Sequence, residues 1–206
     1  MIIVTGSSGF IAGALVRRLL SKKVNNIIIC DFENKSFNDK SLTFIKVDEL
    51  FKFIEKNKLS INFIYHLGAI TDTTCNDENS LSKYNLEFSI NIWNLCVKHS
   101  LPMIYASSAA TYGNGSNGFN DDHNNIKNLV PLNLYAKSKN DFDKFVINQI
   151  ETPPLWFGLK FFNVFGFDES KKKNMSSIVH QSYNTILEFN KMFLFKSYNK
   201  NYNHGY

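Results

Sequence analysis

A phenol and an ammonium group four residues apart are the side chains of this sequence best suited to moving a proton. Tyr135 and Lys139 lie in the segment Tyr-Ala-Lys-Ser-Lys, and in a helix they would share one face, one turn apart. Because a cation beside a phenol stabilises the phenolate, we expect the pKa of Tyr135 to lie below its usual value. The pair therefore predicts a general base at Tyr135, assisted by Lys139.

A run of hydroxyl groups ends an apolar segment upstream of this pair. The stretch Met103–Ser107 has the composition of a buried strand, and Ser108 follows it directly. In an open parallel sheet, the carboxyl ends of the strands form the edge at which ligands bind. Ser108 is therefore a candidate to hydrogen-bond the reacting oxygen of a substrate.

The N-terminal segment Thr-Gly-Ser-Ser-Gly-Phe-Ile-Ala has the spacing of a dinucleotide-binding turn. It follows a short apolar run, so its backbone N–H groups and the start of a helix would face a pyrophosphate. Gly6 permits the tight turn, Gly9 lets the backbone approach the phosphates, and the small Ala12 lets helix and strand pack closely. Phe10 and Ile11 complete the predicted cofactor-binding turn.

An acidic residue after the second predicted strand completes the fingerprint. Asp31 lies about 20 residues beyond the glycines, where a carboxylate accepts hydrogen bonds from the adenosine ribose. It would repel the extra phosphate of NADP, yet Lys35, Lys40 and Lys52 follow closely and could neutralise that phosphate. The sequence therefore predicts NAD or NADP and leaves the choice open, with Lys52 included among the cofactor-binding candidates.

Short apolar runs alternate with amphipathic stretches, which is the pattern of parallel strands joined by crossover helices. The expected fold class is α/β, with a Rossmann-type, doubly wound parallel sheet. Six strands are predicted, at Ile2–Thr5, Asn26–Cys30, Thr43–Val47, Phe63–His66, Met103–Ser107 and Trp156–Lys160. Helices are predicted at about Asn79–His99, Asn133–Gln149 and Asn174–Phe189, and a long surface loop at Gly113–Pro131.

Composition excludes several other classes of protein. The 44% apolar and 20% charged residues are ordinary for a folded domain, and the net charge of +5 is spread over 23 basic and 18 acidic residues rather than gathered on a nucleic-acid-binding arm. Three cysteines without metal-ligand spacing favour a reducing cytoplasm and predict no metal site. No apolar run approaches the roughly 20 residues of a membrane span.

Taken in order, these motifs resemble the extended short-chain dehydrogenases/reductases, the NAD-dependent epimerase/dehydratase family. The resemblance extends along nearly the whole chain and is closest to the ADP-L-glycero-D-manno-heptose 6-epimerases within that family. The supporting segments are Met1–Ile11, His66–Ala69, Tyr105–Gly113, Tyr135–Lys139 and Phe161–Gly166, together with the lysine-rich, methionine-containing stretch that follows.

The resemblance implies a nucleotide-sugar substrate, with ADP-heptose expected, and a homo-oligomer. It also implies that bound NAD or NADP takes a hydride from carbon 6 and returns it to the opposite face. Tyr135 would serve one face as base and Lys172 the other. By the same match the substrate would meet Ser108, Asn163, Asn174 and Gln181, and the cofactor would meet Leu67, Gly68, Ala69, Asn85, Tyr135, Lys139 and Val164.

Family members continue for about a hundred residues into a substrate-binding domain, an expectation that the resemblance carries. We therefore expect a dinucleotide-binding domain at residues 1–166 and, at residues 167–206, only the start of the substrate domain. A chain truncated in this way should keep its cofactor half and bind substrate poorly.

Two alternatives remain open and one is disfavoured. The related 4,6-dehydratases typically place an Asp-Glu pair after the strand-end hydroxyls, where this chain has Ala109 and Ala110, so loss of water is disfavoured. A UDP-hexose 4-epimerase or related sugar oxidoreductase is the nearest enzymatic alternative. A non-catalytic dinucleotide-binding fragment or sensor is the alternative of another class.

Overall fold

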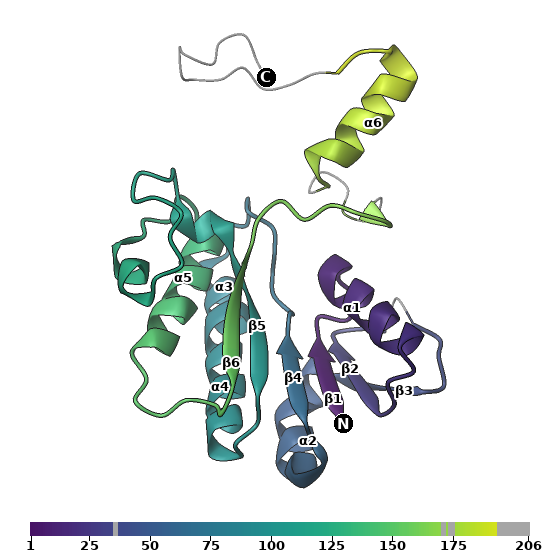
Figure 1. Ribbon diagram of the computed structural model, residues 1–206, viewed down its shortest axis with the longest axis vertical. Coiled ribbons are helices and arrows are strands. Elements are labelled where there is room, and N and C mark those ends of the chain that lie inside the picture. Colours follow the sequence, from purple (N-terminus) through teal and green to yellow (C-terminus); the bar gives the residue numbers. More distant parts are fainter. Residues whose placement is uncertain (35–36, 170–171, 173–175, 193–206) are drawn as a thin grey trace. The chain divides into compact units, whose positions relative to one another are not determined.

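The computed structural model describes residues 1–34, 37–169, 172 and 176–192, and the chain divides into two compact units, Met1–Phe162 and Asn163–Tyr206. Figure 1 shows the first unit as a sheet flanked by helices. The second unit contains the α-helix α6 (Ile178–Phe189). The predicted domain boundary after residue 166 remains a prediction.

The first unit is built on a six-stranded parallel sheet, as the alternating sequence pattern predicts. Its strands are β1 (Ile2–Thr5), β2 (Ile27–Asp31), β3 (Leu42–Lys46), β4 (Phe63–His66), β5 (Met103–Ser108) and β6 (Trp156–Phe161). They lie in the order β3-β2-β1-β4-β5-β6, from right to left in Figure 1. This is the doubly wound order, and all six predicted strands are confirmed to within one residue at each end.

Helices cover both faces of this sheet, and the central strands β1 and β2 bury side chains on both sides. One core cluster joins Val4, Ile27 and Ile29 to Ala12 and Val16 of α1 (Phe10–Ser21). The larger cluster, on the other face, joins the remaining strand residues to α2 (Leu50–Asn57), α4 (Phe88–Lys98) and α5 (Leu134–Ile147). No helix among the described residues is long and apolar enough to cross a membrane.

The helix predicted over residues 79–99 is present but not uniform. It runs as α3 (Glu78–Leu81), a π-helical segment η3 (Ser82–Glu87) and α4, with the Asp77 side chain accepting a hydrogen bond from the Ser80 amide at its start. π-helical turns are rare and often lie at functional sites. Here the π-helical segment contains the fully buried Asn85.

The remaining described elements are short or lie in loops. Four 3₁₀ helices lie wholly within the described residues: η1 (Val47–Glu49), η2 (Lys58–Ser60), η4 (Ala109–Tyr112) and η5 (His123–Asn128). Of these four, only η5 lies within the predicted 113–131 loop. The third predicted helix begins at Ile178, since the Ser177 hydroxyl caps it at the His180 amide, and its predicted first residue, Asn174, lies outside the described residues.

Candidate active site

The glycine turn follows β1 at the carboxyl edge of the sheet, at the point where the strand order reverses between β1 and β4. Gly6 has a φ of +70°, and a Cβ there would lie 2.5 Å from the Cα of Gly68, in the loop after β4. A Cβ at Gly9 would lie 3.0 Å from the carbonyl oxygen of Gly6. Gly9 precedes α1 without a side-chain cap, and Phe10 and Ile11 form the first turn of α1, both half-buried. The turn thus presents bare backbone at the start of a helix.

Asp31, the last residue of β2, hydrogen-bonds the backbone of this turn. One of its carboxylate oxygens accepts a hydrogen bond from the backbone amide of Ser8 at 2.8 Å, and the other accepts from the amide of Phe32 at 2.8 Å. The carboxylate therefore lies beside the glycine turn, as the fingerprint predicts. Among the described residues, no hydrogen bond or ion pair joins the exposed Lys52, on α2, to Asp31.

Buried hydrogen bonds run from β1 across β4. The Thr5 hydroxyl and Nδ1 of His66 are 2.8 Å apart, and Nε2 of His66 lies 2.8 Å from the Ser89 hydroxyl on α4. The Thr5 hydroxyl oxygen also accepts the amides of Leu67 and Gly68, at 3.1 and 3.0 Å. The loop predicted to line the cofactor is therefore fixed to the strand that precedes the glycine turn.

The same chain of bonds continues to the helix that carries Tyr135. The Ser89 hydroxyl donates to the carbonyl of Asn85 at 2.6 Å, and the Asn85 amide nitrogen donates to the Ser138 hydroxyl at 3.0 Å. The Ser138 hydroxyl donates to the carbonyl of Tyr135 at 2.7 Å. Asn85 also pairs with both the amide and the carbonyl of Ile70, at 2.8 and 3.0 Å, which holds the far end of the loop containing Ala69.

His66 makes the stability of this network depend on pH. Burial lowers the pKa of His66 to about 3, with a further lowering by the charge of Lys139. Since the pKa is below its unfolded value of about 6.5, the stabilising contribution is complete above pH 6.5 and is lost as the pH falls from there toward 3. We expect the free energy of unfolding to be about 1 kcal/mol smaller at pH 5.5 than at pH 7.5.

Denaturant titration at the two pH values measures this difference. In the His66→Gln variant, the decrease in the free energy of unfolding between pH 7.5 and pH 5.5 should be smaller. The matched variant His123→Gln changes an exposed histidine and should show the same decrease as the wild type. An undiminished loss in His66→Gln would assign the pH dependence to other groups.

Tyr135 lies in the first turn of α5, where the side chain of Asn133 caps the helix by accepting the Ala136 amide at 2.8 Å. The ring is buried, and the structure differs here from the sequence prediction. Burial raises the pKa of Tyr135, while a hydrogen bond with the Ser108 side chain lowers it and does not outweigh burial. The expected downward shift of the Tyr135 pKa is absent because the phenol is buried away from water.

Ser108 precedes Tyr135 in the sequence and Lys139 follows it, and both side chains lie near the carboxyl end of β5. The Ser108 hydroxyl oxygen also accepts the Ala110 amide at 3.1 Å. The Lys139 ammonium donates to the carbonyl of Ala106 on β5 at 2.9 Å. Burial lowers the pKa of Lys139 to about 8, against an opposing effect of the Asp143 carboxylate. The structure thus brings together three of the four residues predicted to be catalytic.

The fourth, Lys172, belongs to the second unit. Its ammonium donates to the carbonyl of Val164 at 3.1 Å and lies 3.8 Å from the carboxylate of Glu169. Glu169 in turn accepts the amides of Gly166 and Ser177, at 2.8 and 2.6 Å. The two predicted residues Lys172 and Val164 are therefore neighbours within this unit.

The remaining predicted substrate residues also belong to the second unit. Asn163 is exposed, and Gln181, exposed on α6, donates its side-chain amide to the carbonyl of Ser176 at 2.8 Å. Asn174 lies outside the described residues. Their roles remain predictions.

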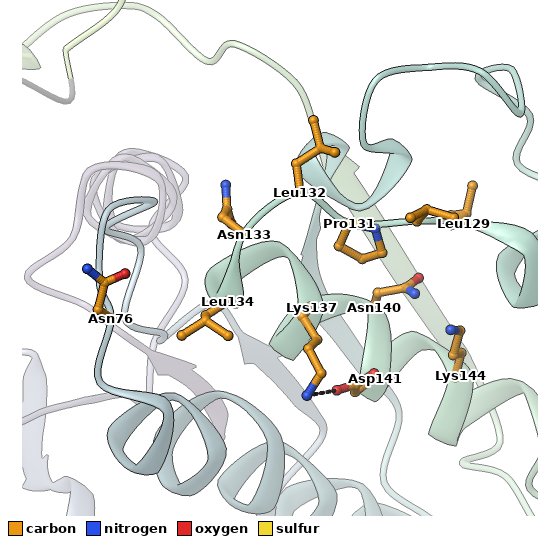
Figure 2. Close-up of a pocket in the computed structure, with 11 residues that line it drawn as sticks. Asn76, Leu129, Pro131, Leu132, Asn133, Leu134, Lys137, Asn140, Asp141 and Lys144 are labelled. Carbon is orange, nitrogen blue, oxygen red and sulfur yellow. Dashed lines mark ion pairs between the residues drawn. The ribbon is translucent and has the colours of Figure 1, made fainter.

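A hollow of about 590 Å³ lies elsewhere, on the side of α5 away from the sheet (Figure 2). Leucines and a proline from the preceding loop form one part of it, and the helix side chains Lys137, Asn140, Asp141 and Lys144 form the other. No residue predicted for catalysis or cofactor binding lines it. It is thus separate from the candidate active site.

The sequence interpretation missed the polar residues that join the two halves of the site. Thr5 and His66 end neighbouring strands at paired positions, and a polar residue that ends an otherwise apolar strand was the available signal. Ser138 precedes Lys139, and Ser89 lies one helical turn after Asn85. Neither serine differs in sequence from an ordinary helix-surface residue, so their role becomes visible only in the fold.

Comparison with known proteins gives consistent results. The chain is 38% identical over 218 residues to ADP-L-glycero-D-manno-heptose-6-epimerase of Fusobacterium nucleatum, covering 100% of this chain and 65% of that protein. It is 35% identical to the enzyme of the same name from Brachyspira hyodysenteriae, covering 95% of this chain and 64% of that protein. The chain thus spans slightly less than two thirds of the length of these relatives.

Solved structures share the fold. The Helicobacter pylori ADP-L-glycero-D-manno-heptose-6-epimerase superposes with a TM-score of 0.76 at 26% identity, covering 93% of this chain and 64% of that one. The Bordetella bronchiseptica enzyme WbmG, solved in complex with NAD and UDP, superposes with a TM-score of 0.74 at 18% identity, covering 95% and 62%. The model of the NAD dependent epimerase/dehydratase family matches residues 2–206. The chain belongs to the NAD-dependent epimerase/dehydratase family.

Proposed function

We propose that this chain is the cofactor-binding and catalytic part of a nucleotide-sugar epimerase that inverts carbon 6 of ADP-L-glycero-D-manno-heptose with bound NAD or NADP. The observation that carries the proposal is the buried chain of hydrogen bonds from Thr5, next to the glycine turn, to Tyr135. It links the glycine turn, which would bind phosphate, to Tyr135, which would transfer the proton. Identity of 38% to a heptose epimerase supports the choice of sugar.

The residues present fit a dinucleotide. Gly6 and Gly9 leave backbone exposed where a Cβ would crowd the turn, and amides at a helix start attract a pyrophosphate. Asp31, beside that turn, suits a ribose hydroxyl. When bound, the nicotinamide supplies a reversible hydride acceptor.

The catalytic side chains would then act on the sugar as follows. The Ser108 hydroxyl would hydrogen-bond the oxygen on the reacting carbon, and Tyr135, as its phenolate, would take the proton of that hydroxyl group and later return it. The buried Lys139 ammonium, whose pKa is about 8, would hold the nicotinamide ribose and stabilise negative charge near the phenol. Lys172 would move the proton for the opposite face of the sugar.

The organisation of the chain is part of the same proposal. Residues 1–166 would form the dinucleotide-binding domain, and residues 167–206 would begin the substrate-binding region, which would include Asn174 and Gln181. We expect a cytoplasmic homo-oligomer, in line with the resemblance described above.

The test is to incubate the chain with either C6 epimer of ADP-heptose and NAD or NADP, and to follow interconversion in heavy water. Direct return of the hydride predicts interconversion without deuterium at carbon 6. Cofactor binding with no interconversion of ADP-heptose would contradict the epimerase proposal for this chain and favour a binding role. Interconversion of UDP-hexoses instead would identify a UDP-hexose, rather than ADP-heptose, as the substrate.

Asp31 should decide between the two cofactors. We expect Asp31→Asn to weaken NAD binding about tenfold, since hydrogen bonds to a charged acceptor exceed neutral ones, and to leave NADP binding equal or tighter because a repulsive charge is lost. Fluorescence titration with both cofactors measures the two dissociation constants. Asp39→Asn is the matched control, because that carboxylate is exposed and accepts hydrogen bonds from the amide and hydroxyl of Ser41. Equal weakening of both cofactors would count against the assigned contact.

A further inference from the structure

A buried ion pair lies directly beneath the candidate active site. Asp143 follows Lys139 by one turn on α5, and its carboxylate oxygen lies 2.5 Å from the ammonium of Lys160 on β6, with side chains 2% and 14% exposed. The same carboxylate accepts the Ser107 hydroxyl at 2.6 Å and the Tyr105 hydroxyl at 3.0 Å. Three donors from two strands therefore converge on one carboxylate.

The Lys160 end of the pair reaches the segment after β5. Its ammonium donates to the Thr111 hydroxyl at 2.7 Å and lies 5.3 Å from the centre of the Tyr112 ring. The Thr111 hydroxyl donates to the carbonyl of Ser108 at 2.7 Å. The ion pair is thus connected on one side to Ser107 and on the other to the backbone of Ser108.

A glycine on β6 leaves space for the Tyr105 hydroxyl that donates to Asp143. Gly158 of β6 pairs with Tyr105, and a Cβ at Gly158 would lie 2.4 Å from the Tyr105 hydroxyl. A larger residue would displace the phenol that donates to Asp143. A buried ion pair contributes little net stability compared with apolar residues of the same volume, so stability alone does not account for this arrangement.

We propose that Asp143 and Lys160 are positioning residues, which hold Ser108 and Lys139 in place for Tyr135. Asp143 would act through Ser107 and through its charge beside Lys139, and Lys160 would act through Thr111. For the catalytic part, this inference rests on the proposed function.

The electrostatic surroundings of Lys139 make the proposal measurable. Burial lowers the pKa of Lys139 to about 8, and the Asp143 carboxylate raises it. Of the other ionisable groups near it, His66 on β4 is neutral, because its pKa is about 3. The pKa of Tyr105 on β5 is raised by burial and by Asp143. Lys160 on β6 is the cation paired with the Asp143 carboxylate.

The experiment is a pH titration of the whole chain labelled with ¹³C at lysine Cε, followed by NMR, with Lys139→Met to assign the resonance. We expect Lys139 to titrate about one pH unit lower in Asp143→Asn, because this substitution removes the carboxylate charge that raises the pKa of Lys139. We expect it to titrate higher in Lys160→Met, because the carboxylate then lacks its compensating cation. Lys160→Arg should restore the wild-type value.

Opposite shifts from the two variants are a result that a merely structural role would not produce. Glu55→Gln is the matched control, since it breaks an exposed ion pair with Lys98 at 2.7 Å and should leave Lys139 unmoved. If one of the two variants does not fold, the direction of the Lys139 titration shift in the other variant decides. An Lys139 titration unchanged in every folded variant of the pair would overturn the proposal.

The titration uses no sugar, so the two proposals can fail separately. Opposite shifts without any interconversion of ADP-heptose would contradict the proposed function and leave the positioning role standing. Interconversion by the wild-type chain, together with wild-type rates and pH profiles in both variants, would contradict the positioning role alone.

Discussion

Replacing Tyr135 by phenylalanine is expected to reduce interconversion of the ADP-heptose epimers about 10²- to 10⁴-fold, the usual contribution of a general acid or base. The phenol lies at the end of β5 within reach of Ser108, and the substitution removes one hydroxyl from a buried ring. The aromatic ring and the cap of α5 remain. The dissociation constant for NAD should therefore change by no more than a few-fold.

Steady-state rates and fluorescence titration with NAD measure the two quantities separately. Tyr65→Phe is the matched control, since it removes the hydroxyl of a half-buried tyrosine on β4 that belongs to neither predicted site. The control should keep the wild-type rate. A Tyr135→Phe variant that also keeps it would refute the assigned role of the phenol.

Replacing Gly6 by alanine is expected to have the largest effect on cofactor binding. The position has a φ of +70°, and the added Cβ would lie 2.5 Å from the Cα of Gly68, which is backbone and cannot rotate away. The left-handed conformation alone costs roughly 1–2 kcal/mol for a residue with a Cβ. The backbone collision adds to that cost and separates the two loops that would hold the dinucleotide.

Gly118 provides a matched control for this substitution. Its φ is +74°, but a Cβ there would have no heavy atom within 4 Å. Gly118→Ala therefore carries the conformational cost without the collision. We expect Gly6→Ala to lose at least about 2 kcal/mol more stability than Gly118→Ala and to bind NAD at least about 100-fold more weakly. Equal losses in the two variants, measured by denaturant titration and cofactor titration, would contradict the tight packing of Gly6 on Gly68.

The sheet could be predicted from sequence because its strands are short, β-branched and bounded by turn residues. Ile2–Thr5 and Phe63–His66 were predicted to the residue, since a glycine turn and polar residues limit them. Parallel order follows from the helices between the strands. The glycine turn, Asp31 and the Tyr135 helix were predictable for the same reason, because each depends on a local pattern.

Contacts between distant segments could not be predicted in this way. The π-helical segment that turns Asn85 toward Ile70 and Ser138 depends on packing against α5. The direction of the Tyr135 pKa shift depends on burial, which the spacing of Tyr135 and Lys139 does not reveal. Asp143 and Lys160 are 17 residues apart and meet only because β6 lies beside β5.

The central claim is that the glycine turn and the Tyr135–Lys139 pair bind two ends of one dinucleotide. A crystal structure of the chain with NAD tests it most directly. We predict a pyrophosphate on the backbone amides that follow Gly6 and a nicotinamide ribose beside Tyr135 and Lys139. A dinucleotide bound instead in the hollow around Asn140 (Figure 2), away from the glycine turn, would contradict it.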